Sequence, residues 1–312
     1  MRRMTYGGLA ALVAASLIQA APPQAAPPAT GPNEGPTVAV LIAPAPISDR
    51  VARATTIVTG KVTSIEEKTV SVEPFPGVKD KVEYIIAVVK IDDAILGAKG
   101  LTHVKVGFQA PQAGGPGRPI IRPGRGQAKL EKDQEVLLFL SPHHGGEFEI
   151  MSAYFDMVDK KTDTYEKDVE AAKKYIKLLA EPEKGLKSKD AADRLETANM
   201  LVTKFRTPQP SAKPPKEEPI DADMSKQIMN VLADADWTPP KPGGPPRGNF
   251  QVTPIGIFFR LGVTEKDGWK PPQDGNKFNE YVETWVKENK DKYRIKKFVA
   301  EKEEKKDDKK GK

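Results

Sequence analysis

Apolar and polar residues alternate in short runs along the first half of the chain, which is the pattern of β-strands. The first run is rich in β-branched side chains, which suit a pleated surface. The second is apolar on both faces and therefore predicts a central strand covered on each side. The runs span residues 55–65, 82–91, 103–108, 136–140 and 148–154. Five short strands with irregular loops favour a small, partly open β-barrel.

The hydrophobic period becomes helical after residue 163. Asp163 followed by Glu166 resembles a capping box, and Pro182 is expected to end that helix. Ser188 and Asp223 are candidate caps for the next two helices. A last helix is predicted over residues 278–289, and residues 255–261 are a candidate further segment of the same helical part.

Proline-rich stretches divide the chain into segments. We expect an α+β protein, in which a small OB-like antiparallel β-barrel is followed by an irregular α-helical domain, with disordered termini and Pro-rich linkers. The predicted segments are a signal peptide (1–21), a Pro/Ala-rich tether (22–47), the barrel with a closing helix (48–181), the helical domain (182–300) with linkers at 207–219 and 238–248, and a charged tail (301–312).

The N-terminus has the pattern of an export signal. Arg2 and Arg3 precede a short apolar run, and small residues follow at Ala20 and Ala21, where a signal peptidase cleaves. The apolar run is too short for a stable membrane span, so we expect no transmembrane segment in the mature protein. The sequence therefore predicts a protein exported to the periplasm or the medium.

Composition limits the chemistry. The 312-residue chain contains no cysteine, which excludes disulfides, thiolate metal sites and thiol nucleophiles. Its formal charge of +6 includes Arg2 and Arg3, and the remaining excess is too small to imply nucleic-acid binding. No cofactor motif is recognisable, and we expect no cofactor and no nucleic-acid partner.

Four sequence runs resemble the OB-like barrel of netrin-type modules, which include the tissue inhibitors of metalloproteinases. These runs are VTGKVTSI, AVVKIDDAILGAKG, HVKVGF and KLEKDQEVLLFL, within residues 53–154. The resemblance implies a barrel fold, but those inhibitors use an N-terminal cysteine and disulfides, and this chain has none. The whole chain also resembles exported bacterial proteins, which implies no particular activity.

His143 and His144 are candidate metal ligands. They lie in the turn SPHHGGEFEI, and imidazole and carboxylate are suitable ligands for zinc. With Asp156 they would form a metal-assisted hydrolytic site. Adjacent histidines on a tight turn rarely point at one ion, and no HExxH framework is present, so solvent-facing turn residues are the simpler interpretation.

Two other surfaces are candidate binding sites. The loop between Gln109 and Gln127 has Arg118, Arg122 and Arg125 and no acidic residue, a composition suited to phosphate or carboxylate. A solvated connector loop is the alternative. Trp269 is a candidate exposed contact for a partner, whereas Trp285 follows a helical apolar stripe and is expected in the core.

These features favour a non-catalytic exported protein that binds or scaffolds components of the cell envelope, with an envelope protein or an anionic polymer as its partner. The first alternative is a metal-assisted hydrolase that uses His143 and His144. A further alternative, implied by the resemblance, is a protease inhibitor with a netrin-like fold.

Overall fold

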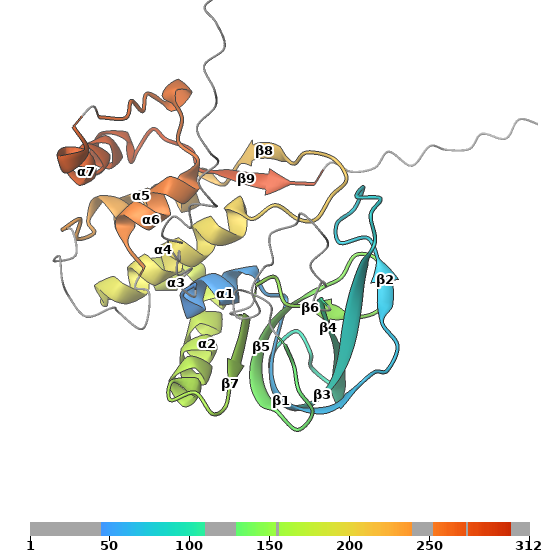
Figure 1. Cartoon of the computed structure of the whole chain (residues 1–312). Coiled ribbons are helices and arrows are strands. Elements are labelled where there is room, and N and C mark those ends of the chain that lie inside the picture. Colours follow the sequence, from blue (N-terminus) through green and yellow to red (C-terminus); the bar gives the residue numbers. More distant parts are fainter. Residues whose placement is uncertain (1–44, 110–128, 154–155, 239–251, 273, 301–312) are drawn as a thin grey trace, which may run out of the picture. The chain divides into compact units, whose positions relative to one another are not determined.

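A computed structural model describes residues 45–109, 129–153, 156–238, 252–272 and 274–300 (Figure 1). The predicted signal peptide, nearly all of the tether, the charged tail and the three arginines of the basic loop lie outside these ranges. The chain has an α+β fold, as predicted. No helix within the described ranges is long and apolar enough to cross a membrane.

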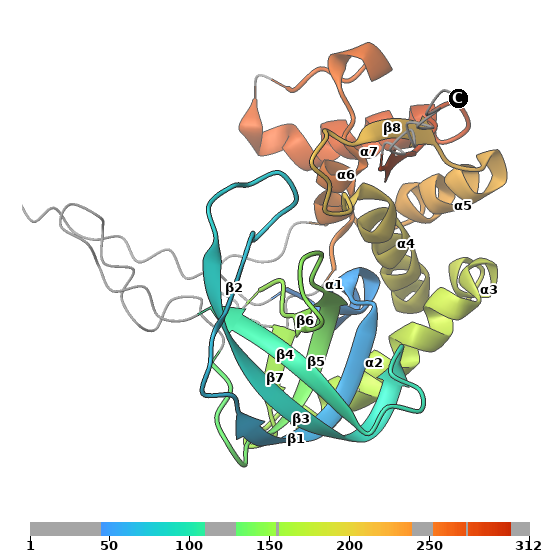
Figure 2. The same ribbon diagram turned by 90° about the vertical axis from the view of Figure 1, so that its right-hand side faces the viewer.

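Seven strands form one mixed sheet (Figure 2). They are β1 (Thr56–Ile65), β2 (Val70–Val72), β3 (Val82–Leu96), β4 (His103–Gln109), β5 (Glu135–Pro142), β6 (Glu149–Ile150) and β7 (Met157–Asp159). β3 pairs with β1, β2 and β4, which confirms the central strand that its two apolar faces predict. β1 also pairs with β5, so the order of pairings β1-β3-β4-β6-β5 returns to β1.

The expected OB-like barrel is not established by these pairings. β6 is only two residues long, and it joins β4 through two parallel residue pairs and β5 through two antiparallel ones. One short strand supplies few backbone hydrogen bonds between β4 and β5. The strands therefore form a seven-stranded mixed sheet, in which β6 links β4 and β5 through only a few residue pairs.

Alternation along β1 and β5 gives the sheet two apolar faces. Val58, Val62, Leu138 and Leu140 pack in one buried cluster with residues of β3 and β4. The intervening residues Ile57, Leu137 and Phe139 face a second cluster that includes side chains of three helices. These are α1 (Ile47–Arg53), α2 (Tyr165–Ala180) and α4 (Ala191–Arg206).

Gly60 marks a close approach within the sheet, as its place inside a predicted strand suggests. A Cβ at this position would lie 2.3 Å from the Lys90 carbonyl oxygen. The β1–β3 register also shifts between Thr59 and Gly60. Any larger residue would force the two strands apart, because the obstructing atom belongs to the backbone of β3.

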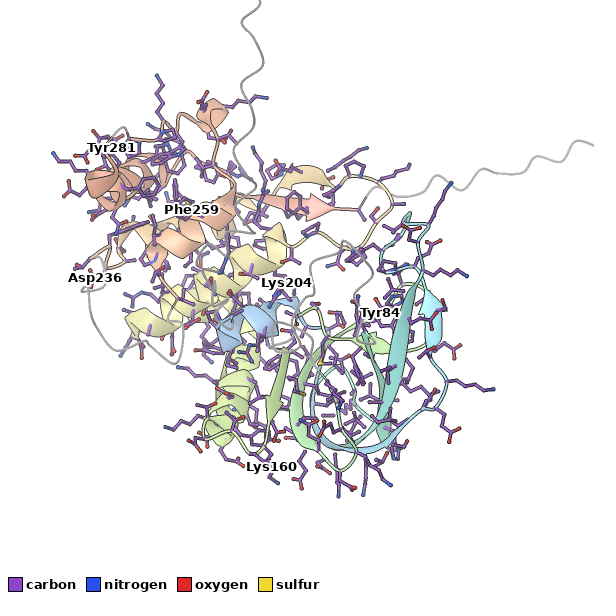
Figure 3. The ribbon with its side chains drawn as sticks, in the orientation of Figure 1. Tyr84, Lys160, Lys204, Asp236, Phe259 and Tyr281 are labelled. Carbon is purple, nitrogen blue, oxygen red and sulfur yellow. The ribbon has the colours of Figure 1, made fainter. Side chains whose placement is uncertain are left out.

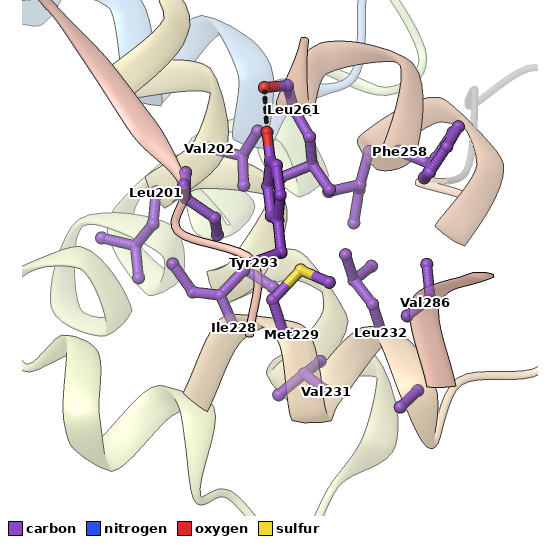
Figure 4. Close-up of a cluster of buried hydrophobic side chains, with 14 of the residues drawn as sticks. Leu201, Val202, Ile228, Met229, Val231, Leu232, Phe258, Leu261, Val286 and Tyr293 are labelled. Carbon is purple, nitrogen blue, oxygen red and sulfur yellow. Dashed lines mark hydrogen bonds between the residues drawn. The ribbon is translucent and has the colours of Figure 1, made fainter. Parts of the chain in front are cut away.

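The remaining elements pack around a separate apolar cluster (Figure 4). They are α3 (Pro182–Leu186), α5 (Ala222–Ala233), α6 (Pro254–Leu261) and α7 (Phe278–Asn289), and α4 contributes to the same cluster. Two short 3₁₀ turns cover Glu265–Asp267 and Gly275–Lys277. Inside the cluster the Tyr293 hydroxyl donates to the Leu261 carbonyl over 3.1 Å, and Trp285 is buried, as its helical stripe predicts.

Several predicted boundaries need correction. Thr164, not Asp163, precedes α2, and no side chain caps that helix. Asp190 rather than Ser188 caps α4, and Asp221 rather than Asp223 caps α5; each accepts a hydrogen bond from a backbone N–H of the first turn. In both corrected cases the acceptor has an extended backbone immediately before the helix, which is the conformation that capping requires.

The predicted linker 207–219 also contains a strand. β8 (Lys216–Pro219) pairs antiparallel with β9 (Lys296–Val299) in a two-stranded sheet. Its four residues are all exposed, so no hydrophobic alternation marked them in the sequence. The partner strand lies about 80 residues away in the chain, and this distant pairing rather than local pattern orders the segment.

Candidate functional site

A cavity of about 660 Å³ lies where β4, β5 and β6 end. Its walls come from both sides of the weak β4–β5 junction, from the start of β3 and from the segment that follows α4. The lining residues used below are Arg53, Phe75, Tyr84, Phe108, His143 and Pro208. Sheet geometry therefore places the cavity at the point where the paired strands separate.

Gly107 allows one wall of the cavity to form. This residue belongs to β4, and a Cβ here would lie 2.4 Å from the ring of Phe148. The missing side chain lets Phe148 lie directly over the strand. The Phe148 ring in turn stacks on His143, with 4.8 Å between ring centroids and 18° between their planes.

His143 is buried, with 5% of its surface exposed. The Gly145 N–H donates to Nδ1 over 3.1 Å, which puts the proton of the neutral ring on Nε2. Nε2 is buried and has no hydrogen-bond partner among the described residues. Burial, followed by the neighbouring His144, lowers the pKa of His143, so the ring is neutral at neutral pH.

Arg53 brings a cation to the cavity from the end of α1. Its Nε donates to the Asp49 carbonyl over 3.2 Å, which fixes the side chain. Its Nη2 lies 3.6 Å from Oδ1 of Asp156, a distance too long for a direct hydrogen bond. Burial raises the pKa of Asp156 even though Arg53 and Arg50 lower it, and the Ala153 N–H donates to Oδ2 over 2.8 Å.

Aromatic, aliphatic, proline and uncharged polar residues form the rest of the lining, and Tyr84 is labelled in Figure 3. Tyr84 of β3 is buried and meets the His143 ring edge-on at 5.1 Å. Phe75, in the loop between β2 and β3, is 61% exposed. Residues 207–210 approach from the end of α4 and add Pro208 and Pro210. The cavity can therefore hold an apolar group beside a single permanent cation.

The structure brings together only part of the predicted site. His143 and His144 both line the cavity, with their ring centroids 4.6 Å apart. The solvent-facing interpretation is correct for His144 and wrong for His143, because the stacked Phe148 ring covers His143. Asp156 is not part of the lining, but it pairs with Arg53, which is.

No cluster of three or more His, Asp or Glu side chains suited to a metal ion occurs among the described residues. Within the same residues, no hydrogen bond joins His143 to a serine or to an acid; its one ring contact of this kind is with Gly145. Nothing in the described part of the chain therefore resembles a nucleophile–base pair or a zinc site around these histidines.

Trp269 lies away from the cavity. Its ring is half-buried and meets Phe258 of α6 edge-on at 4.9 Å and Phe278 of α7 at 6.1 Å. The partner surface predicted around it remains a prediction. Phe259 and Tyr281, labelled in Figure 3, are the large apolar residues most exposed on α6 and α7.

A second group of polar side chains, three of them buried and Arg260 half-buried, joins α1, α4 and α6. Arg260 donates from Nη1 and Nη2 to the two carboxylate oxygens of Asp49 over 2.9 and 2.8 Å. Asn199 donates to Asp49 over 2.7 Å, and Arg260 also donates to Asn199 and Thr203. These four side chains, called the α1–α4–α6 network below, satisfy one another's hydrogen-bonding groups.

Sequence reasoning missed most of the cavity. Arg53 belongs to no recognisable motif. The sequence predicts only that Tyr84 lies in a strand and that residues 207–210 belong to a linker. The one local signal was the turn SPHHGGEFEI, in which two histidines and two glycines sit between strands. The other lining residues come from distant parts of the chain, so no local pattern connects them.

Comparisons with models of known protein families, with curated proteins and with solved structures give no match to this chain.

Proposed function

We propose that the chain is a non-catalytic binding protein of the cell envelope, exported by its N-terminal signal, and that the cavity is its ligand site. The observation that carries this proposal is the composition of the cavity wall. It combines apolar rings, one permanent cation among the described lining residues and a buried imidazole, a combination typical of small-molecule sites. The order of pairings that returns to β1 supports an OB-like barrel, a fold that often binds ligands at its rim.

Two buried polar atoms without a hydrogen-bond partner, one in the cavity wall and one near it, also support binding. The Nε2–H of His143 is a buried donor without an acceptor among the described residues, and one oxygen of the nearby strand residue Glu149 lacks a partner too. Burial raises the pKa of Glu149. Unsatisfied buried polar groups weaken a fold, and proteins retain them most often where function requires them.

Crosslinking in cells tests the site. A photoreactive phenylalanine at position 75, in the cavity wall, should capture a defined component of the envelope. The same residue at position 101 is the matched control, because Leu101 has a similar exposure, 57% against 61%, and does not line the cavity. Equal capture from both positions, or capture from position 101 alone, would exclude the cavity as the binding site.

Metal analysis separates binding from the hydrolase alternative. We expect the purified mature protein to contain no stoichiometric zinc, and a His143→Ala/His144→Ala variant to have the same metal content. A stoichiometric ion that this variant loses would contradict the non-catalytic proposal. The protease-inhibitor alternative predicts that the protein slows secreted proteases, which an enzyme panel would detect.

Export has its own test. The mature protein recovered from the periplasm or the medium should begin near residue 22, as determined by intact-mass measurement. Recovery of the full-length chain from the cytoplasm alone would contradict the assignment to the envelope. The variant Arg118→Ala/Arg122→Ala/Arg125→Ala tests the predicted basic loop, whose arginines lie outside the described ranges.

A further inference from the structure

The cavity has a single permanently charged lining residue among those the structure describes. Arg53 is that residue, and no lysine, aspartate or glutamate accompanies it in the wall. His143 adds no charge at neutral pH because its pKa is lowered by burial. A negatively charged group of a ligand could contact Arg53 from the cavity, on the exposed part of a guanidinium that also pairs with Asp156.

Arg53 is positioned to share its charge with a ligand. Its side chain keeps 27% exposure, whereas that of its partner Asp156 keeps 4%. The 3.6 Å separation between Nη2 and Oδ1 leaves the pair without the short bidentate geometry of a strong arginine–carboxylate contact. By contrast, Arg260 makes that bidentate contact with Asp49 in the same molecule.

The apolar part of the wall surrounds this cation. Phe75, Tyr84 and Phe108 supply rings, and Ile150 and Met151 supply aliphatic surface. Prolines at 74, 142, 208 and 210 also line the cavity, together with uncharged polar side chains such as those of Ser141 and Gln209. The volume of about 660 Å³ falls within the range of cavities that enclose small molecules rather than stretches of polymer.

We infer that the cavity binds a small aromatic or branched apolar molecule bearing one carboxylate. The carboxylate is held by the Arg53 guanidinium, and the apolar body lies against Phe75, Tyr84 and Phe108. This assignment rests on the proposed binding function and adds the chemical class of the ligand. Among the described lining residues a carboxylate has one cation to pair with, the Arg53 guanidinium, and a carboxylate matches the planar fork of that group.

Three probes with the same apolar body test the charge requirement on the unmodified mature protein. They are 4-biphenylacetate, 2-(4-biphenylyl)ethanol and 2-(4-biphenylyl)ethylamine, compared by calorimetric titration. The carboxylate should bind about tenfold more tightly than the alcohol, since hydrogen bonds to charged groups are the stronger class. The amine should bind more weakly than the alcohol because its charge has the sign of Arg53.

Arginine variants identify the anchor. Arg53→Gln should bring the affinity for 4-biphenylacetate down to that for the alcohol, and Arg53→Lys should retain part of the preference. Arg194→Gln is the matched control, because Arg194 bonds backbone carbonyls outside the cavity. If Arg53→Gln does not fold, Phe75→Ser takes its place: it should weaken all three probes equally, and Leu101→Ser should weaken none.

The outcomes distinguish a wrong ligand class from a wrong binding function. Equal affinity for the three probes, lost in Phe75→Ser, would overturn the carboxylate assignment and leave the cavity as a binding site. Tighter binding of the amine would overturn it as well. If no probe binds, the assignment is wrong, and crosslinking from position 75 decides independently whether the binding function stands.

Discussion

Two regions of the molecule bury polar side chains, and they treat them in opposite ways. In the α1–α4–α6 network, Asp49, Asn199, Thr203 and Arg260 meet one another at hydrogen-bonding distance. Nε2 of the cavity residue His143, and one oxygen of the nearby β6 residue Glu149, have no hydrogen-bond partner among the described residues. Arg53 and Asp156 form an ion pair with 3.6 Å between Nη2 and Oδ1.

The difference separates polar groups that hold the fold from those at the proposed binding cavity. Removing one partner of a buried ion pair with complete hydrogen bonding strongly lowers the stability of the folded state. A buried group without a partner already weakens the folded state, so its removal costs little stability. Substitutions in the two regions should therefore differ most in the free energy of unfolding.

The largest effect is expected from Asp49→Ala. The change leaves the Arg260 guanidinium without its carboxylate and should lower the free energy of unfolding by about 2–3 kcal/mol, measured by urea denaturation. The loss should be smaller than for a fully buried pair, because the Arg260 side chain is 36% exposed. Asp291→Ala removes the exposed Lys226–Asp291 pair and serves as the control, with little change expected. Equal effects would mean that the network does not stabilise the packing of α1 on α4 and α6.

Asn199→Ala should cost less, about 1–2 kcal/mol, because it removes one donor and one acceptor while the Asp49–Arg260 pair remains. A double-mutant cycle with Asp49→Ala measures the coupling between Asn199 and Asp49. Coupling is expected because Asn199 and Arg260 both donate to Oδ1 of Asp49. The combined variant should lose less than the sum of the two single losses. Simple additivity would argue against a connected network.

The pH dependence of the free energy of unfolding should show the lowered pKa of His143. Its pKa is lower in the folded protein than its ordinary value of 6.5, chiefly because of burial. The unfolded chain then binds more protons between the two values, so the free energy of unfolding falls as pH drops below 6.5. Urea denaturation from pH 8 to pH 5 should show a steeper decline for the unmodified protein than for His143→Gln.

Three carboxyl groups have pKa values raised by burial, namely those of Glu149, Asp156 and Glu196. Their contribution runs in the opposite direction, because stability from a raised carboxyl pKa is lost as pH rises. The comparison with His143→Gln removes this shared background. Parallel curves for the two proteins would show that His143 does not titrate differently on folding.

The smallest effect on stability belongs to Phe75→Ser. Its ring is largely exposed, so the urea midpoint should stay close to that of the unmodified protein and of Leu101→Ser. Binding of 4-biphenylacetate should nevertheless fall in Phe75→Ser alone. A large loss of stability would instead make Phe75 part of the fold and weaken its assignment to the ligand site.

Local pattern was enough to identify most of the secondary structure. The β-branched run predicted β1, the two apolar faces predicted the central strand β3, and the helical stripe of Phe278–Asn289 predicted α7 and the burial of Trp285. These features depend on neighbours within a few residues, so the sequence contains the whole signal. The helix caps were displaced by one to two residues, because several polar residues near each start compete for the same role.

The sequence by itself determined the α+β class, the absence of thiol chemistry and the segments that become strands and helices. Only the tertiary structure decided which polar groups meet. Asp49 and Arg260 are 211 residues apart, and Arg53, Tyr84, His143 and Pro208 come from four separate segments. The first contact depends on how α1 and α6 pack, and the cavity depends on how β4 and β5 separate beyond the two-residue β6; no local periodicity encodes either arrangement.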